Sequence, residues 1–106
     1  MLGEFEYLVL SAAFRLGTDA YGAAIRRAIE DATGRGCSIG ALYTTLDRLE
    51  NKGLVKTWMG ASTPERGGRS KRIVSVTSKG VQAASSFYKA VTRVSRDVSW
   101  SMADQA

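Results

Sequence analysis

The spacing of apolar residues changes at Gly53, and this change constrains the fold more than any other feature of the sequence. Before Gly53 the apolar residues recur at steps of three and four, which predicts one buried face of an α-helix. These residues are Ile39, Leu42, Leu46 and Leu49. After Gly53, residues 54–59 and 72–76 are β-rich runs, and the loop between them, residues 60–70, contains glycines and the proline. Two short strands are only marginally stable alone, so this hairpin must pack against helices.

Three further segments predict helices. Residues 2–16 carry apolar residues on more than one side, residues 21–32 are amphipathic, and residues 78–101 are a long segment without proline. Ser38 and Thr77 stand where helices begin, and a hydroxyl there accepts a hydrogen bond from a free amide of the first turn. We therefore expect both residues to be N-caps.

The order of these segments, three helices, a hairpin and a last helix, is that of a winged helix-turn-helix. We predict a mainly α fold with a small β-hairpin, in which residues 1–77 form a winged helix-turn-helix DNA-binding domain and residues 78–106 a C-terminal dimerisation helix of the same structural unit. The 106 residues suffice for one domain with a modest core. No apolar run is long enough to span a bilayer, and the start lacks the pattern of a signal peptide. We expect a cytoplasmic protein with no membrane partner.

The absence of histidine removes the commonest metal ligand and general base. The single cysteine, Cys37, cannot form a disulfide within the chain. We therefore predict no catalytic residue, no metal and no cofactor. Cys37 precedes a predicted helix, where its thiol would be either a redox sensor or a small buried residue.

The net charge of +5 is concentrated in one stretch. Residues 52–72 contain six basic residues and one acidic residue, whereas the rest of the chain contains nine of each. A basic segment on an otherwise neutral domain is typical of a protein that binds a polyanion. The alternative is a loop whose charges only keep the protein soluble.

The outer face of the helix that follows Ser38 carries small, hydroxylic or cationic residues. In a helix-turn-helix the second helix of the pair lies in the major groove, and small residues allow close approach to DNA. We predict that the following residues contact DNA: Ser38, Gly40, Ala41, Thr44 and Arg48. Tyr43 lies at the border of this face, where its hydroxyl would find either an internal partner or a phosphate.

The loop of the hairpin carries cations around two glycines. We predict that this loop is a wing that enters a minor groove or binds phosphates, which would make DNA binding steeply dependent on salt. The predicted contacts are Arg66, Arg69 and Lys71. The alternative is a solvated hairpin tip.

The last helix repeats apolar residues at steps of three and four over most of its length. It would either fold back on its own domain or form a dimer together with the first helix, and we prefer the dimer because one small domain cannot cover so much apolar surface. Candidates for the dimer interface, or for an effector site between subunits, are Phe5, Leu8, Ala12, Phe87, Tyr88, Val91, Val94, Val98 and Trp100.

The chain resembles PadR-type transcriptional regulators over most of its length. The resemblance lies in "YG" at residues 21–22, "GALYTTLDRLENKGLV" at residues 40–55, "GGRSKRIVSVTSKG" at residues 67–80, and the long helix predicted after them. With a single C-terminal helix, the chain resembles the short subgroup of this family. It implies a cytoplasmic dimeric repressor, with "SIGALYTTLDR" as the recognition helix, "GGRSK" as the wing and Tyr43 among the DNA contacts. Thr44 stands where the family often has proline.

These observations together predict a sequence-specific DNA-binding transcriptional regulator. We expect a homodimeric repressor that binds a double-stranded, pseudo-palindromic operator and is released by a small hydrophobic or aromatic effector. The alternative is a winged-helix module that uses its basic wing to bind an acidic protein instead of DNA.

Overall fold

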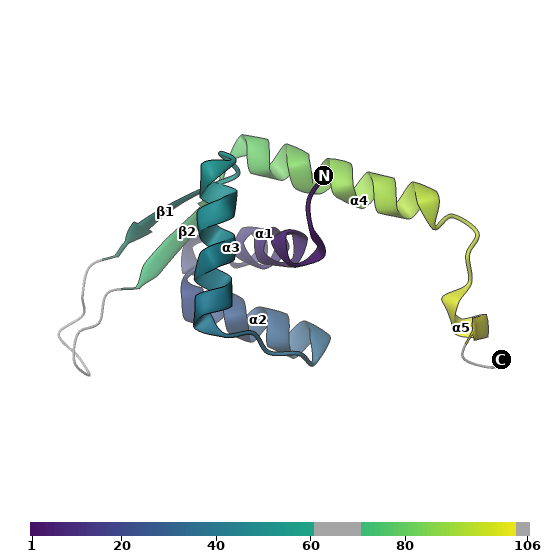
Figure 1. Cartoon of the computed structure of the whole chain (residues 1–106), viewed down its shortest axis with the longest axis horizontal. Helices are drawn as coiled ribbons and strands as arrows, with labels where there is room; N and C mark the ends of the chain where they lie inside the picture. Colours follow the sequence, from purple (N-terminus) through teal and green to yellow (C-terminus); the bar gives the residue numbers. More distant parts are fainter. Residues whose placement is uncertain (61–70, 104–106) are drawn as a thin grey trace.

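The structure, a computed structural model, describes residues 1–60 and 71–103. Its elements in chain order are α1 (Glu4–Leu16), a short 3₁₀ turn η1 (Gly17–Asp19), α2 (Gly22–Thr33), α3 (Ile39–Asn51), β1 (Val55–Met59), β2 (Arg72–Val76), α4 (Ser78–Val94) and α5 (Trp100–Ala103). Figure 1 shows α1, α2 and α3 gathered together, the hairpin on one side of them and α4 leading away on the other. The predicted mainly α fold with a small hairpin is confirmed.

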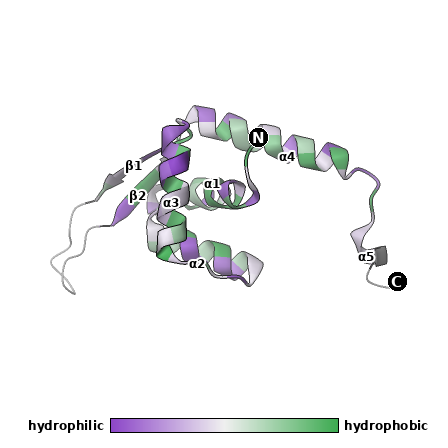
Figure 2. Cartoon of the chain, in the orientation of Figure 1, coloured by the Kyte–Doolittle hydropathy of each residue, from purple (hydrophilic) through white to green (hydrophobic). Residues whose placement is uncertain are grey.

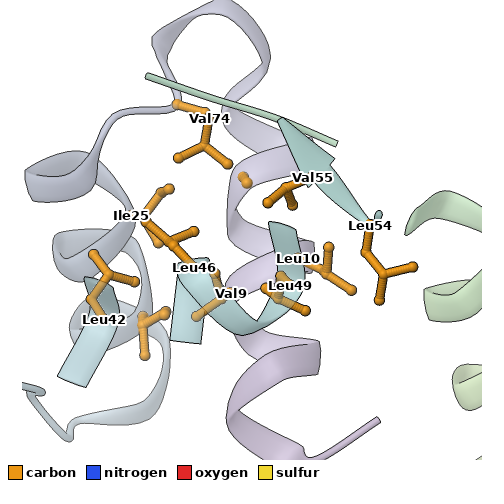
Figure 3. Packing of buried hydrophobic residues seen from close by; sticks show 12 residues of the cluster. Val9, Leu10, Ile25, Leu42, Leu46, Leu49, Leu54, Val55 and Val74 are labelled. Carbon is orange, nitrogen blue, oxygen red and sulfur yellow. The ribbon is translucent and has the colours of Figure 1, made fainter. Parts of the chain in front are cut away.

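The core lies where the first three helices meet the hairpin. Side chains from α1, α2, α3 and both strands converge there (Figure 3). The fully buried large side chains are Val9, Leu10, Ile25, Leu42, Leu46, Leu49, Val55 and Val74. Burial of such side chains contributes about 1.5–3 kcal/mol each, so this cluster is the main source of stability. It also fixes which face of α3 points outward.

Ile39 is the exception to the predicted core face, because 40% of its surface is exposed. It is the first residue of α3 and lies beyond the edge of the core, against the start of α2 near Gly22. The prediction that Ile39 anchors the helix in the core is therefore wrong, whereas Leu42, Leu46 and Leu49 are buried as predicted.

The strands β1 and β2 are antiparallel, with Val55 opposite Val76 and Met59 opposite Arg72. The chain between α1 and α2 extends this small sheet, since the Val74 amide donates to the Ala20 carbonyl at 2.8 Å. An isolated bridge joins Tyr21 to Ile73 beside that bond. The hairpin is thus fastened to the helices by backbone hydrogen bonds as well as by its apolar side chains.

Both predicted N-caps are present. The Ser38 hydroxyl accepts from the Ala41 amide at 3.0 Å, and the Thr77 hydroxyl accepts from the Gly80 amide at 3.0 Å. Thr77 also donates through its hydroxyl to the Gly53 carbonyl at 2.7 Å. This bond ties the start of α4 to the turn that ends α3.

The last helix is shorter than predicted. It ends at Val94, where the Ser95 hydroxyl donates to the Val91 carbonyl at 2.7 Å, and Asp97 has a φ of 63°. A serine that bonds the backbone competes with the helical pattern, and aspartate tolerates left-handed backbone. Val98 therefore lies outside any helix, and Trp100 opens the separate helix α5. The prediction of one helix over residues 78–101 is wrong.

The inward stripe of α4 continues beyond the domain that it packs against. Gly80 is buried and Phe87 partly buried against the domain, whereas Val91 and Val94 on the same stripe are 49% and 85% exposed. Figure 2 shows hydrophobic residues along α4 up to its C-terminal end. The radius of gyration is 15.9 Å, against about 13 Å for a compact domain of about this length. The second half of α4 thus has an apolar stripe without a partner in its own described chain.

An ion pair joins the start of α1 to the end of α3. The Glu6 carboxylate, only 11% exposed, accepts from the Lys52 ammonium at 2.9 Å and from the Gly3 amide at 2.9 Å. The hydrogen bond from Gly3 and then that from Lys52 lower the pKa of Glu6 below its ordinary value of 4.5. A carboxyl group with a lowered pKa stabilises the fold above its unfolded-state pKa, and this contribution disappears as the pH falls through its folded-state pKa.

Glu6→Gln should therefore lower the free energy of unfolding by about 1 kcal/mol at neutral pH. The difference from the wild type should shrink as the pH falls below 4.5, because the wild-type carboxylate then becomes protonated. Urea unfolding followed by circular dichroism at each pH measures this difference. Glu4→Gln, an exposed change in the same helical turn, is the matched control. A difference for Glu6→Gln that did not shrink at any pH below 4.5 would contradict this role of the ion pair.

Candidate nucleic-acid interface

The outward face of α3 consists of small and polar residues, as predicted. Because three leucines hold the opposite face in the core, the following residues are exposed: Ser38, Gly40, Ala41, Thr44, Asp47 and Arg48. We call this set the helix surface. Thr45, by contrast, is 6% exposed and faces the core side. The helix surface contains Asp47, which sequence reasoning did not include, although its spacing of three from Thr44 places it on the same face.

The space above Gly40 is open. A Cβ built on Gly40 would meet only the Ser38 hydroxyl oxygen, at 4.0 Å, so the described fold does not require glycine here. Glycine in a helix costs about 0.5–1 kcal/mol relative to alanine. A residue that weakens the helix without a packing reason indicates that something outside the chain must come close to the backbone.

Tyr43 occupies the border between α3 and its neighbours. A Cβ on Gly22 would lie 3.2 Å from Tyr43 Cε1, so the buried glycine at the start of α2 leaves room for the tyrosine ring. On its other side the ring centroid lies 5.0 Å from Arg72 Cζ. The ring is half-buried, and its hydroxyl has no hydrogen-bond partner among residues 1–60 and 71–103. Both predicted interpretations stay open: the ring packs internally and the hydroxyl is able to donate outward.

The wing residues Arg66 and Arg69 lie outside the described residues. Lys71 is exposed at the start of the returning strand, and its ammonium lies 4.1 Å from the centroid of the Tyr21 ring. The Gly60 amide donates to the Lys71 carbonyl at 2.7 Å, which closes the described part of the hairpin. Lys71 is thus held beside the start of α2.

Arg72 was counted among the basic residues of the hairpin, but the structure places it inward. Its guanidinium is 15% exposed and donates to Asp47 Oδ1 at 2.7 Å and to the Thr57 hydroxyl at 3.3 Å. Glu50 Oε1 lies 4.0 Å from it. The partners are 25 and 15 residues away in sequence, so only the hairpin register, which was not predicted residue by residue, could have identified them.

The residues predicted for a dimer or effector site do not share one cavity of the single chain. Phe5 and Leu8 line a cavity of about 260 Å³ with Cys37, Phe87 lines a cleft of about 700 Å³ near Leu2, and Tyr88 lines a groove of about 350 Å³. Ala12 is partly buried on α1, and Val98 and Trp100 are 48% and 71% exposed beyond α4.

The groove of about 350 Å³ lies between α1 and α4 and is almost entirely apolar. Its aromatic lining residues are Tyr7, Phe14 and Tyr88. Phe14 is 63% exposed and Tyr88 59% exposed, so this groove opens to the outside of the chain next to the unpartnered stripe of α4. Phe87 packs against Tyr7 of α1, with its ring centroid 4.9 Å from that of Tyr7.

Cys37 is partly buried, and its carbonyl accepts from Arg26 Nε at 3.0 Å. Neither interpretation of its thiol, as a redox sensor or as a small buried residue, is tested by these contacts. Within the described ranges, no three His, Cys, Asp or Glu side chains come together as a metal site would require. No helix among these residues has both the length and the hydropathy to cross a membrane.

The chain matches one family model and several solved structures. The sequence model described as "Transcriptional regulator PadR-like family" matches residues 9–86. The solved structure of H. salinarum RosR has 26% identity and a TM-score of 0.68, and the match covers 92% of this chain and 81% of RosR.

Two further structures share the fold. A PadR family transcription regulator from hypervirulent Clostridium difficile has 23% identity and a TM-score of 0.69, covering 91% of this chain and 94% of that one. A PadR-like transcriptional regulator from Bacillus cereus has 21% identity and a TM-score of 0.71, covering 89% and 86%. No curated protein matches the chain significantly.

Proposed function

Because the chain belongs to the PadR-like family of transcriptional regulators, we propose that it is a sequence-specific DNA-binding repressor that acts as a homodimer in the cytoplasm. As a member of that family it regulates transcription and is not an enzyme. The observation that carries the proposal is the helix surface of α3, which is exposed, built of small and polar residues and open above Gly40. Such a surface suits a helix that lies in the major groove.

The DNA contacts in this proposal come from two elements. The helix surface supplies Ser38, Gly40, Ala41, Thr44 and Arg48, and Tyr43 reaches a phosphate with its hydroxyl. Lys71, and from the sequence alone Arg66 and Arg69, supply charge from the wing. Phosphate contacts by the wing would position the protein, whereas side chains of α3 would read base edges.

The second half of α4 supports the homodimer. Its apolar stripe leaves Val91 and Val94 exposed, and Tyr88 stands beside them. A second copy would bury this stripe against the same surface of its partner, as in a two-fold symmetric dimer. Two α3 helices would then face half-sites about one DNA turn apart, or a multiple of it, in a pseudo-palindromic operator near a promoter.

A small hydrophobic or aromatic effector would bind in the groove between α1 and α4. The groove is apolar and lined by three aromatic rings, and it adjoins the surface that the dimer would bury. A ligand that fits the groove in only one arrangement of the two subunits would shift the dimer toward that arrangement. Release from DNA follows if that arrangement misplaces the two α3 helices.

Gly40→Ala separates the demands of the fold from those of DNA. The added methyl group meets open space, so the free energy of unfolding should stay unchanged or rise by about 0.5 kcal/mol. DNA affinity should fall about tenfold, because the methyl group stands where the backbone approaches DNA. Urea unfolding and a gel-shift titration measure the two effects. Unchanged affinity would show that α3 does not approach DNA at Gly40.

Gel-shift titration at two salt concentrations, with duplexes enriched by the protein from a random-sequence pool, tests the proposed function. The wild type should form a discrete complex that weakens steeply with salt, and Thr44→Ala and Lys71→Gln should each weaken it. Lys89→Gln, an exposed change on α4, is the control. If no duplex is enriched and binding is insensitive to salt, the DNA-binding proposal fails, and the acidic protein partner takes its place.

A further inference from the structure

Arg72 has a different environment from the exposed Lys71 that precedes it. It begins β2, and its guanidinium contacts a group of α3 side chains that lie on the flank facing the hairpin. Asp47 accepts its hydrogen bond at 2.7 Å, Glu50 lies 4.0 Å away, and the Tyr43 ring centroid lies 5.0 Å from Arg72 Cζ. These three residues are spaced by four and three along α3 and so form one continuous row on the helix.

The hairpin supplies further bonds to this row. The Thr57 hydroxyl accepts from Arg72 at 3.3 Å, and the Thr57 amide donates to Glu50 Oε2 at 3.0 Å. Both strands of the hairpin are therefore bonded to the same flank of α3 through polar groups. The guanidinium at the centre is 15% exposed, while Asp47 and Glu50 are 65% and 42% exposed.

The exposed carboxylates decide what Arg72 does when DNA is bound. If Arg72 turned to a phosphate, Asp47 and Glu50 would stay beside the polyanion without their cation, and both would repel it. If Arg72 stays in place, it neutralises one carboxylate and keeps the hairpin at a fixed distance from α3. A planar guanidinium is suited to this role because it donates in several directions at once.

We propose that Arg72 is a positioning residue, a latch that holds the β1–β2 hairpin against α3 through Asp47 and stays internal in the DNA complex. This inference rests on the proposed function. Its consequence is that the Arg72–Asp47 pair sets the distance between the bases read by α3 and the phosphate touched by Lys71. It also keeps the Asp47 carboxylate, which belongs to the helix surface, away from the phosphates.

The salt dependence of binding to a short random-sequence duplex tests the latch. Asp47→Asn should release Arg72 to the DNA and increase the magnitude of the slope of log affinity against log salt by about one. The double variant Asp47→Asn with Arg72→Gln should return to the wild-type slope. If Arg72 contacts phosphate in the wild type, Asp47→Asn should leave the slope unchanged and the double variant should lower it by about one, which overturns the proposal.

Arg72→Gln alone should bind the enriched duplex about tenfold more weakly, since the hairpin is displaced and a carboxylate is left unpaired. Arg72→Lys should recover part of this loss, because it keeps the charge beside Asp47 but replaces the planar guanidinium with a more compact and more strongly hydrated ammonium on a flexible stem. Lys71→Gln is the comparison for a true phosphate contact. It should decrease the magnitude of the slope of log affinity against log salt by about one. Full recovery by Arg72→Lys would mean that only the charge matters, which contradicts a latch.

Urea unfolding of the free protein separates failure of the latch from failure of the proposed function. For a latch, the unfolding midpoint of the double variant should fall no further than that of Arg72→Gln alone, because the two changes remove one interaction. If the decreases in midpoint caused by Asp47→Asn and Arg72→Gln add up in the double variant, the latch is overturned whether or not the protein binds DNA. A wild type that binds no duplex would overturn the proposed function, and the unfolding midpoints would still decide on the latch.

Discussion

Gly80→Ala should lower the free energy of unfolding by about 3 kcal/mol, a large fraction of the stability of a domain of this size. Gly80 is buried in the first turn of α4, and a Cβ there would overlap the Leu54 carbonyl oxygen and lie 2.9 Å from Val76 Cγ1. The Leu54 carbonyl accepts from the Thr77 amide at 3.0 Å, so it cannot move without breaking the bond at which α4 begins. Urea unfolding followed by circular dichroism measures the loss.

Gly40→Ala is the matched control for this substitution. Both glycines lie in the first turn of a helix with a hydroxyl N-cap, but only Gly80 is packed against backbone. The two variants should therefore differ by about 3 kcal/mol in the free energy of unfolding, in opposite directions from the wild type. Equal changes in the free energy of unfolding would contradict the close packing of Gly80 against the Leu54 carbonyl.

Val91→Asp should convert the proposed homodimer into a monomer. Val91 lies on the stripe that a second copy would bury, and a carboxylate on that stripe would lose its water without gaining a partner. We expect the dissociation constant of the dimer to rise at least about a hundredfold, which corresponds to about 2.7 kcal/mol. Sedimentation velocity over a range of protein concentrations measures this change. Operator affinity should fall with it, because two half-sites are no longer bound together.

Lys89→Asp is the control for the dimer prediction. Lys89 lies two residues before Val91, on the opposite, solvated face of α4. Its replacement by aspartate introduces the same carboxylate as Val91→Asp. It should leave the dimer intact. If Val91→Asp and Lys89→Asp both sediment as dimers, the exposed apolar stripe of α4 is not the dimer interface.

The sequence predicts α3 well because three independent signals coincide there. Leucines at helical spacing, a serine N-cap and a glycine after the last turn all indicate the same segment, and the observed helix begins directly after Ser38. Ile39 was misplaced because periodicity assigns a side to a residue but not a depth. Ile39 is on the side of α3 that faces the core, but as the first residue of the helix it lies beyond the edge of the core.

The end of α4 was missed for a different reason. Apolar spacing continues through Ser95 toward Val98, but the serine hydroxyl bonds the Val91 carbonyl and Asp97 takes a left-handed conformation. Such local competition with the helix depends on single side chains and leaves the apolar period intact. Gly40 and Gly80 illustrate the same limit, because the sequence presents both as helix-weakening glycines and only the packing separates them.

The charge pattern of the candidate interface was predicted only in part. Six cations lie in residues 52–72, but two of them are bound within the fold: Lys52 pairs with Glu6, and Arg72 pairs with Asp47. A count of charges treats every arginine as available to a partner. The hairpin register and the helix phase together determine which are available, and neither was fixed by the sequence at single-residue precision.

A hydroxyl-radical footprint on a duplex enriched from a random pool tests the central claim most directly. The claim predicts two protected patches related by approximate two-fold symmetry, with centres about one helical turn of DNA, or a multiple of it, apart. The same footprint with Val91→Asp should lose this paired protection at concentrations that protect the wild-type complex. A single patch for the wild type, or bound protein without protection at regular spacing, would contradict a dimer that presents two α3 helices to DNA.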